Sequence, residues 1–298
     1  MSVVIYKERF VDVGFIGIGL MGTPMALRLL QNGVRVTVYN RTQSKLESLK
    51  QAGIVAAPSV AELLSNVDCI VLMVTNAKAI TSLILNPEVK PFLSGRGIIQ
   101  MSTIAPYQSQ GIAQEIIAAG GEYLEAPVLG SIPQATDGSL IVMAGSTPDC
   151  FEKYQPLLKC FGPDPMYMGD VGTASAAKLA MNQLIGSLTA AFSLSLGMVK
   201  RSGIDVDQFM EIVRQSALYA PTFDKKLQRM CDRNFENPNF PTKHLLKDML
   251  LVTETSQAMG LDARLSDSVC QIVQQTMDQG LSEADYSALY ATINPLDC

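Results

Sequence analysis

The sequence predicts an α/β protein in which a doubly wound parallel β-sheet is followed by an all-α region. Short apolar runs alternate with helical patterns through the first half of the 298-residue chain, which is typical of a parallel sheet with helices on both faces. Beyond Gly172 the strand-like runs stop and long helical patterns follow. With 48% apolar and 17% charged residues, the chain can bury a large core without disulfides or a structural metal.

The first half contains runs with the composition of buried strands. Cys69–Val74 is apolar throughout, as expected of a strand covered on both faces. Two predicted helices, Ser44–Ala52 and Ser59–Asn66, each open with a capping-box pattern, a serine followed three residues later by a glutamate. Further strands are predicted at Val11–Ile16, Val34–Tyr39, Ile98–Met101, Tyr123–Glu125, Leu140–Ala144 and Met166–Met168, and the first helix at Met21–Asn32.

The second half is predicted to be entirely helical. Thr173–Arg201 forms one long helical pattern, and prolines fall between or beyond the later helices, where they are tolerated. We therefore expect two domains, residues 1–171 and residues 172–298. The later helices are predicted at Asp205–Gln215, Thr222–Asp232, Thr242–Met259, Ala263–Gln279 and Asp285–Ile293.

Charge and composition argue against several classes of function. The net charge is −5, and acidic residues outnumber basic ones in both halves, so neither half resembles a nucleic-acid-binding domain. A single histidine, His244, argues against catalytic zinc. The six cysteines are too sparse for a disulfide framework and are interpreted as reduced thiols. Residues 179–199 carry no charge, but the polar residues among them favour a buried core helix over a membrane span.

A glycine-rich turn joins the first predicted strand to the first helix. Its sequence, Gly17-Ile18-Gly19-Leu20-Met21-Gly22, has the GxGxxG spacing. Gly17 permits the tight turn, Gly19 lets the backbone approach a pyrophosphate, and Gly22 lets helix and strand pack closely. The helix N-terminus then faces the anion. Such turns also occur without a ligand, but the strand–turn–helix context favours dinucleotide binding by a Rossmann domain.

The residues after the second strand bear on which dinucleotide binds. NAD-binding domains usually carry Asp or Glu here, which holds the ribose 2′-hydroxyl. This chain has Asn40-Arg41-Thr42 instead, so no carboxylate repels a 2′-phosphate. Arg41 can pair with that phosphate, and Asn40 and Thr42 can donate hydrogen bonds to it. We therefore expect NADP(H) as the cofactor; the alternative is that Arg41 is a solvated surface charge.

Lys178 and Asn182 are candidate catalytic residues on the long helix. They are four residues apart and therefore lie on one helix face. Both interrupt an apolar stretch where the sheet domain ends, and a cleft between domains is a common ligand site. A carbonyl reductase needs a proton donor beside the hydride acceptor, and with one histidine in the chain Lys178 is the better candidate. The alternative is a boundary lysine whose ammonium reaches solvent.

Taken together, several segments resemble the β-hydroxyacid dehydrogenases, and among them the NADPH-dependent glyoxylate and succinic semialdehyde reductases. The resemblance covers all but about the first ten residues. It implies a Rossmann domain, a helical domain, and hydride transfer between a nicotinamide cofactor and a small oxo or hydroxy acid. The segments that carry it are Gly17–Gly22 with Met25 and Ala26, Met101–Ile104, Glu125–Ser131, Gly169–Gly172 leading to Lys178 and Asn182, Phe240–Asp248 and Gly280–Ala288.

The resemblance implies a role for each matching site residue. Lys178 corresponds to the catalytic lysine of the family, and Asn182 to its hydrogen-bonding partner in the substrate site. Gly130 and Ser131 occupy the loop that receives the substrate carboxylate through backbone N–H groups. The other implied contacts are Ser102 and Asp248 with the substrate site, and Val74, Thr75, Thr103 and Lys247 with the cofactor. From the residues alone, Lys247 and Asp248 could instead form a surface ion pair.

The chain departs from the family pattern in its substrate loop. Glu125 stands where the family often has Asp, and Leu129 where it often has Ser. Leu129 removes a hydroxyl donor and adds bulk, which alters how the loop recognises a carboxylate. The intact Lys178 argues against the imine reductases, which usually carry another residue there, and against non-enzymatic relatives that have lost the lysine.

The expected function is reduction, by NADPH, of the carbonyl group of a short oxo acid such as glyoxylate or succinic semialdehyde. Lys178 acts as general acid in this hypothesis, Asn182 orients the oxygen, and Ser102 with the Gly130–Ser131 backbone holds the carboxylate. Three alternatives stay open: oxidation of a 3-hydroxy acid such as 3-hydroxyisobutyrate, imine reduction as a side activity, and NADP binding without catalysis.

The long apolar helix also predicts self-association. It carries more apolar surface than one small helical domain needs to cover, so we expect a homodimer or homotetramer. The first ten residues include three charges and no long apolar run, so no secretory signal is visible. We therefore expect a cytoplasmic protein that binds neither membrane nor nucleic acid.

Overall fold

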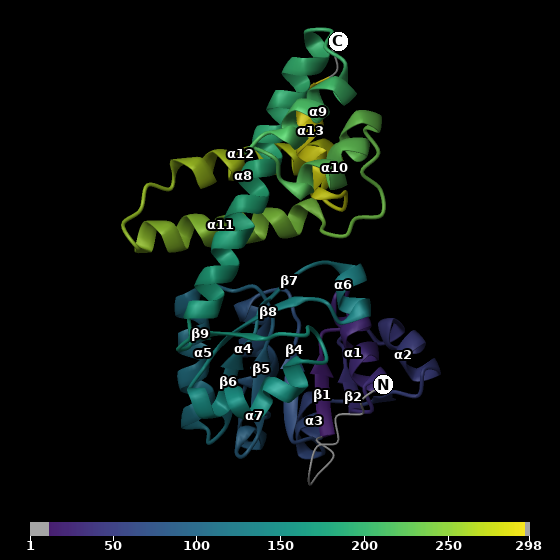
Figure 1. Ribbon diagram of the computed structural model, residues 1–298. Helices are drawn as coiled ribbons and strands as arrows, with labels where there is room; N and C mark the ends of the chain where they lie inside the picture. The colour runs from purple at the N-terminus through teal and green to yellow at the C-terminus, as the bar shows by residue number, and fades with distance from the viewer. Residues whose placement is uncertain (1–11, 296–298) are drawn as a thin grey trace. The chain divides into compact units, whose positions relative to one another are not determined.

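The computed structural model describes residues 12–295, which form two compact units that divide between Lys178 and Leu179. The first contains a β-sheet with helices packed on it, and the second is built from helices (Figure 1). The expected fold class is confirmed. Val11, predicted as the start of the first strand, lies outside the described residues. The division at Lys178 falls inside the long helix, a few residues beyond the expected boundary at residue 171.

The sheet has the strand order β3-β2-β1-β4-β5-β6-β8-β7, with β9 paired to β8. Strands β1 to β6 are parallel to their neighbours in this order, whereas β8 is antiparallel to β6 and β7. The sequence analysis missed β3 and β7, which have two residues each and no detectable periodicity. The strands are β1 (Asp12–Ile16), β2 (Arg35–Tyr39), β3 (Val55–Ala56), β4 (Cys69–Leu72), β5 (Gly97–Gln100), β6 (Glu122–Glu125), β7 (Val128–Leu129), β8 (Ile141–Gly145) and β9 (Met166–Gly169).

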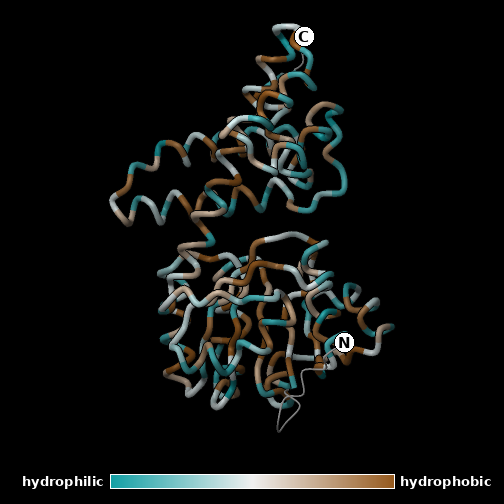
Figure 2. Tube along the Cα trace, in the orientation of Figure 1, coloured by the Kyte–Doolittle hydropathy of each residue, from teal (hydrophilic) through white to brown (hydrophobic). Residues whose placement is uncertain are grey.

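The central strands are buried on both faces because helices cover each side. Along β4, Cys69 and Val71 join the apolar cluster under α1, α2 and α7, whereas Ile70 and Leu72 join the cluster under α3, α4 and α5. Hydrophobic residues accordingly gather along these strands (Figure 2). The helices of this unit are α1 (Gly22–Gln31), α2 (Glu47–Gln51), α3 (Val60–Ser65), α4 (Ala77–Ile84), α5 (Pro106–Ala118), α6 (Ile132–Asp137) and α7 (Pro148–Leu158).

One of the two predicted capping boxes is wrong. Ser59 does cap α3, and its hydroxyl accepts a hydrogen bond of 3.1 Å from the backbone N–H of Glu62. Ser44, in contrast, lies inside a 3₁₀ turn, Gln43–Leu46, and α2 begins only at Glu47 without a side-chain cap. Thr42 occupies the extended position that precedes this turn, and the chain already turns from Gln43, so Ser44 cannot adopt the extended conformation that a capping residue needs.

The second unit matches the helical prediction closely. The predicted Ala263–Gln279 helix, however, ends at Thr276 and continues as a π turn, Met277–Leu281, in which Gly280 adopts φ +84°. The predicted Asp285–Ile293 helix is a short 3₁₀ turn, Tyr286–Ala288, followed by α13. The helices are α8 (Thr173–Arg201), α9 (Val206–Gln215), α10 (Pro221–Asp232), α11 (Thr242–Ala258), α12 (Arg264–Thr276) and α13 (Leu289–Ile293).

Helix α8 is less buried than the sequence suggested. It is long and apolar enough to cross a membrane by length and composition alone, a test that core helices also pass, and 39% of its most apolar window is buried. Asn182, Thr189 and Ser193 point into the protein. Leu184 and Met198, which are 48% and 64% exposed, lie on the opposite face. This helix therefore presents a row of apolar side chains that the described chain does not cover.

The described cysteines are free thiols, as predicted. Burial raises the pKa of Cys69 to about 12 and that of Cys150 to about 11. Because the thiolate is the reactive form, these two side chains are structural apolar groups at neutral pH. Cys298 lies outside the described residues.

Candidate active site

The loops that carry the predicted cofactor residues meet at one edge of the sheet. Strands β1, β2, β4 and β5 are parallel, so the segments that follow Ile16, Tyr39, Leu72 and Gln100 all emerge at the same edge. The strand order reverses between β1 and β4, and such a switch point is where open α/β sheets bind their ligands. The predicted turn, the residues after β2, and the Val74–Thr75 and Ser102–Thr103 segments are thus brought together.

The glycine-rich turn is tight on its inner side and open on its outer side. Gly17 has φ +104°, and a Cβ there would lie 2.2 Å from the carbonyl oxygen of Met73. A Cβ on Gly22 would lie 1.9 Å from the carbonyl oxygen of Gly17, whereas one on Gly19 would meet nothing within 4 Å. Helix α1 begins here with no side-chain cap and no acidic residue in its first turn. The turn and the uncapped helix end therefore fit a pyrophosphate.

Asn40 holds the turn in place. Its Oδ1 accepts a 3.0 Å hydrogen bond from the backbone N–H of Ile18, and its Nδ2 donates to the carbonyl oxygen of Thr42 at 2.9 Å. These bonds connect the end of β2 to the glycine turn. Arg41 and Thr42 are exposed beside it. The Asn40 side chain thus bonds to the backbone of the glycine turn and of its own loop, whereas the side chains of Arg41 and Thr42 face solvent.

Ser102 is a buried link between two loops. Its hydroxyl accepts a hydrogen bond of 2.8 Å from the backbone N–H of Val74 and donates one of 3.4 Å to the carbonyl oxygen of Leu72. The residue is 1% exposed. Its hydroxyl therefore fixes the Val74 segment against the end of β5, next to the half-buried Thr103 and the exposed Thr75.

The predicted substrate loop is braced by its own capping box. Both the backbone N–H and the hydroxyl of Ser131 donate to Oε1 of Gln134, at 3.0 and 2.8 Å, and so begin α6. The Ser-x-x-Gln spacing of residues 131–134 is the sequence signal for this box. Gly130 is exposed at φ +138°, and Leu129 is half-buried in β7 opposite Ile141. The N–H of Ser131 is therefore already engaged.

Asn182 and Asp248 form a buried pair within the second unit. Asn182 Nδ2 donates to Asp248 Oδ2 at 2.7 Å, and Lys247 Nζ lies 2.7 Å from Asp248 Oδ1. A carboxylate can only accept, so the amide nitrogen of Asn182 faces Asp248 and its Oδ1 faces away. The Asp248 side chain is 4% exposed, so Lys247 and Asp248 do not form the surface ion pair that the sequence allowed.

Lys178 lies in the second turn of α8, half-buried, one helical turn before Asn182. The first turn of this helix is held by Glu125, a residue noted in the sequence only as a departure from the family pattern. Its carboxylate accepts hydrogen bonds from the backbone N–H groups of Gly172, Ala174 and Ser175 at 2.7, 2.9 and 3.1 Å. No local pattern could have shown this, because the cap is 47 residues or more away in the chain.

Comparison with known proteins agrees with this geometry. The family model for the NAD binding domain of 6-phosphogluconate dehydrogenase matches residues 12–169, and that for the NAD-binding of NADP-dependent 3-hydroxyisobutyrate dehydrogenase matches residues 172–293. Glyoxylate/succinic semialdehyde reductase 1 of Arabidopsis thaliana is 32% identical over 95% of this chain and 98% of its own length. The chain belongs to the β-hydroxyacid dehydrogenase family. It is an NAD(P)-dependent oxidoreductase of the kind that acts on small hydroxy or oxo acids.

Two further relatives show the range of this dehydrogenase family. A crystal structure of 3-hydroxyisobutyrate dehydrogenase from Salmonella typhimurium superposes with a TM-score of 0.84 at 25% identity, over 94% of this chain and 99% of that chain. The human cytokine-like nuclear factor N-PAC is 29% identical over 93% of this chain. The match with this chain covers 50% of the length of N-PAC.

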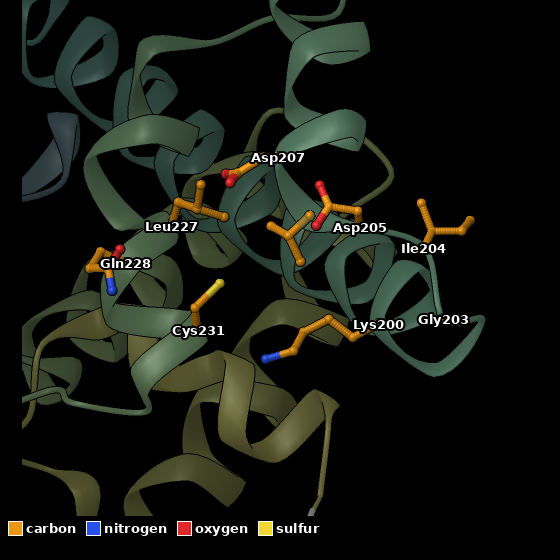
Figure 3. A pocket seen from close by; sticks show the side chains of 9 residues that line it. Lys200, Gly203, Ile204, Asp205, Asp207, Leu227, Gln228 and Cys231 are labelled. Carbon is orange, nitrogen blue, oxygen red and sulfur yellow. The ribbon is translucent and has the colours of Figure 1, made fainter.

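A separate pocket in the helical unit of this dehydrogenase lies far from Asn182. Figure 3 shows it near the C-terminal end of α8, lined by Lys200, Asp205, Asp207, Leu227 and Cys231 among others, with a cavity volume of about 500 Å³. Eighteen residues of α8 separate Asn182 from Lys200, a distance of about 27 Å along the helix. Burial raises the pKa of the Cys231 thiol, so it is not a thiolate at neutral pH.

Proposed function

We propose that this dehydrogenase works as an NADPH-dependent reductase of short oxo acids such as glyoxylate and succinic semialdehyde. The observation that carries the proposal is the half-buried Lys178, one helical turn before an asparagine that the buried Asp248 holds in a single orientation. A lysine in this setting can give a proton to a carbonyl oxygen. Relatives named as glyoxylate/succinic semialdehyde reductases, at 32% identity, support this choice of substrate class.

The side chains divide the work as follows. NADPH, when bound, supplies the hydride. The ammonium of Lys178 stabilises the negative charge that develops on the substrate oxygen and donates its proton to it. The second N–H of Asn182 Nδ2, the one that does not bond to Asp248, donates to that oxygen, and Asp248 together with Lys247 fixes the Asn182 amide. Oxidation of a 3-hydroxy acid would use the same groups in the opposite direction, with the neutral amine of Lys178 accepting the hydroxyl proton and NADP⁺ the hydride.

The substrate carboxylate is assigned to the Gly130–Ser131 loop with Ser102. Because the N–H of Ser131 already donates to Gln134, we assign the anion contact first to the backbone of Gly130, which is exposed. Ser102 contributes by fixing the Val74 segment. Leu129 supplies an apolar wall, which favours the methylene chain of succinic semialdehyde over the smaller glyoxylate.

A substrate series tests the proposal. We expect NADPH oxidation with glyoxylate and with succinic semialdehyde, and a kcat/KM for succinic semialdehyde about 10²-fold above that for butanal, because a buried anion contact is worth roughly 1.5–3 kcal/mol. Butanal has the same chain length without the carboxylate, so it is the matched control. Equal turnover of butanal would contradict carboxylate recognition, and no turnover of any aldehyde would contradict the reductase proposal.

The cofactor is assigned as NADP(H), with Arg41 and Thr42 on its 2′-phosphate and Asn40 supporting the loop. We expect Arg41→Ala to raise the KM for NADPH about 10- to 100-fold, because it removes a charge-assisted contact of roughly 1.5–3 kcal/mol. The KM for NADH should stay unchanged. Lys50→Ala is the control, since Lys50 is a nearby cation already paired with Glu47. Equal effects on both cofactors would contradict the assignment.

The remaining cofactor contacts are assigned to Gly17, Gly19, Leu20, Met21 and Gly22 in the turn, and to Val74, Thr75, Thr103 and Lys247. Functionally, residues 1–171 are the NADP-binding domain and residues 172–298 the helical domain. The exposed apolar row on α8 supports a homodimer or homotetramer. We place the protein in the cytoplasm, without membrane or nucleic-acid partners.

A further inference from the structure

Glu125 is a fully buried carboxylate at the end of β6 whose oxygens are filled with hydrogen-bond donors. Besides the three backbone N–H groups at the start of α8, the hydroxyls of Ser175 and Ser109 donate to its Oε2 at 2.6 and 2.5 Å. All five donors are neutral groups. The negative charge is therefore offset by hydrogen bonds and by the positive end of the α8 dipole.

The groups that surround Glu125 and its serine donors are arranged to keep these hydrogen bonds. Ser109 donates to Glu125, so its oxygen must accept from the hydroxyl of Tyr123, 2.8 Å away. Burial raises the pKa of Tyr123, which keeps that hydroxyl protonated and able to donate. A Cβ on Gly145 would lie 2.6 Å from Oε1 of Glu125, so the glycine makes room for the carboxylate. Tyr123 thus donates to Ser109, and both Ser109 and Ser175 donate to Glu125.

We propose that Glu125 is a positioning residue for Lys178, acting through the first turn of α8. The proposal rests on the proposed function, because it concerns the residue assigned there as proton donor. Glu125 is 0% exposed and both of its oxygens bond to the protein, so we assign it no direct contact with substrate or cofactor.

The geometry couples the two residues through one turn of helix. Ser175, which bonds to Glu125 through both its N–H and its hydroxyl, is three residues before Lys178 and therefore on the same face. Side chains on a helix lean toward its N-terminus, so Lys178 extends over the turn that Glu125 anchors. Helix ends fray unless their orphan N–H groups are satisfied, and Glu125 accepts those of Ala174 and Ser175. Loss of Glu125 would release the segment from which Lys178 projects.

If Glu125 acts through its hydrogen-bond geometry, its variants should differ in kcat in a specific order. In Glu125→Gln the amide oxygen can still accept the three N–H groups, while the amide nitrogen donates to hydroxyls that can rotate to accept. In Glu125→Asp the charge stays but the oxygens withdraw by one carbon–carbon bond. In Glu125→Ala every acceptor is lost. We therefore expect kcat within about 3-fold of wild type for Gln, and losses of roughly 10²-fold for Asp and Ala, the cost of misplacing a catalytic group by about 1 Å.

Two readouts need no turnover. Hydrogen–deuterium exchange of residues 172–178 should accelerate at least about 10-fold in the Asp and Ala variants but not in Gln. Without the Glu125 acceptor, the backbone amides at the start of α8 open more often and are less protected. The extent of reductive methylation of the Lys178 amine in the cofactor-free protein, measured by mass spectrometry, should differ from wild type in the same two variants. Glu122→Gln is the matched control, because Glu122 lies on the same strand but pairs with Lys153 and Tyr154 instead.

The outcomes separate the two proposals. Faster exchange with unchanged Lys178 labelling and unchanged kcat would reduce Glu125 to a helix cap and overturn the positioning role. A full loss of kcat in Glu125→Gln would also overturn it, because the charge would then matter rather than the geometry. If Lys178→Ala keeps wild-type kcat while labelling of Lys178 still depends on Glu125, the assigned function of Lys178 fails and the structural coupling stands.

Discussion

Replacing Gly22 by alanine is expected to abolish measurable NADPH binding and to lower the free energy of unfolding by about 1–3 kcal/mol, the usual cost of overpacking. Alanine is favoured over glycine inside a helix by about 1 kcal/mol. That gain is outweighed here, because the new Cβ would lie 1.9 Å from the backbone carbonyl oxygen of Gly17, which cannot move without opening the turn. Isothermal titration with NADPH and thermal unfolding measure the two effects.

Gly19→Ala is the matched control for the Gly22 variant. A Cβ on Gly19 meets no protein atom within 4 Å, so the unfolding temperature should stay at the wild-type value. The methyl group would nevertheless occupy the side from which a pyrophosphate approaches, so NADPH affinity should fall at least about 100-fold. Loss of stability in Gly19→Ala, or unchanged affinity in both variants, would contradict the assignment of this turn as the pyrophosphate site.

Lys178→Ala is expected to lower kcat for carbonyl reduction by about 10²- to 10⁴-fold, the range typical of a general acid. NADPH affinity should change by less than about 3-fold, because the cofactor contacts are assigned to the sheet edge and to Lys247, not to this side chain. Steady-state kinetics with succinic semialdehyde, alongside fluorescence titration of NADPH, measure both quantities. The Ala variant should keep its unfolding temperature, since Lys178 is only half-buried.

Lys178→Arg distinguishes proton donation from simple charge. Arginine keeps a positive charge beside the substrate oxygen but holds its protons too tightly to give one up near neutral pH. We expect the Arg variant to lose nearly as much kcat as the Ala variant. Recovery of more than a third of wild-type kcat in Lys178→Arg would mean that the side chain acts as a fixed charge and that another group donates the proton.

The longer strands and the helices of the second half could be predicted from the sequence because each strong pattern had one physical cause, whereas α4, α5, α6 and α7 were not predicted. Strand β4 is apolar at every position because helices cover both of its faces, and GxGxxG between a strand and a helix allows few other structures. The long helix Thr173–Arg201 was predicted residue for residue, since it starts after a glycine turn and ends at a basic pair. The glycine turn, the residues after the second strand, Lys178 and Asn182 were singled out from the pattern, and the resemblance to a known family added the other site residues.

The contacts that fix the site could not be predicted, because they join residues far apart in the chain. The side chain of Asn40 was predicted to donate a hydrogen bond to a phosphate. The fold instead brings it within hydrogen-bond reach of Ile18, 22 residues earlier. The amide of Asn182 bonds to Asp248, 66 residues away, and Glu125 accepts from the N–H of Gly172, 47 residues later, just before α8 begins. Propensity and spacing describe neighbours in sequence, and only tertiary packing decides which of these polar groups meet.

The central claim is that the chain transfers hydride from NADPH to the carbonyl carbon of a short oxo acid. The most direct test is to incubate the wild-type protein with succinic semialdehyde and NADPH deuterated at C4 of the nicotinamide, and to analyse the product by mass spectrometry and NMR. The account predicts 4-hydroxybutyrate with one deuterium on the carbon that carries the new hydroxyl. NADPH that binds tightly but is never oxidised, with no deuterated product, would contradict it and favour a protein that binds NADP without catalysis.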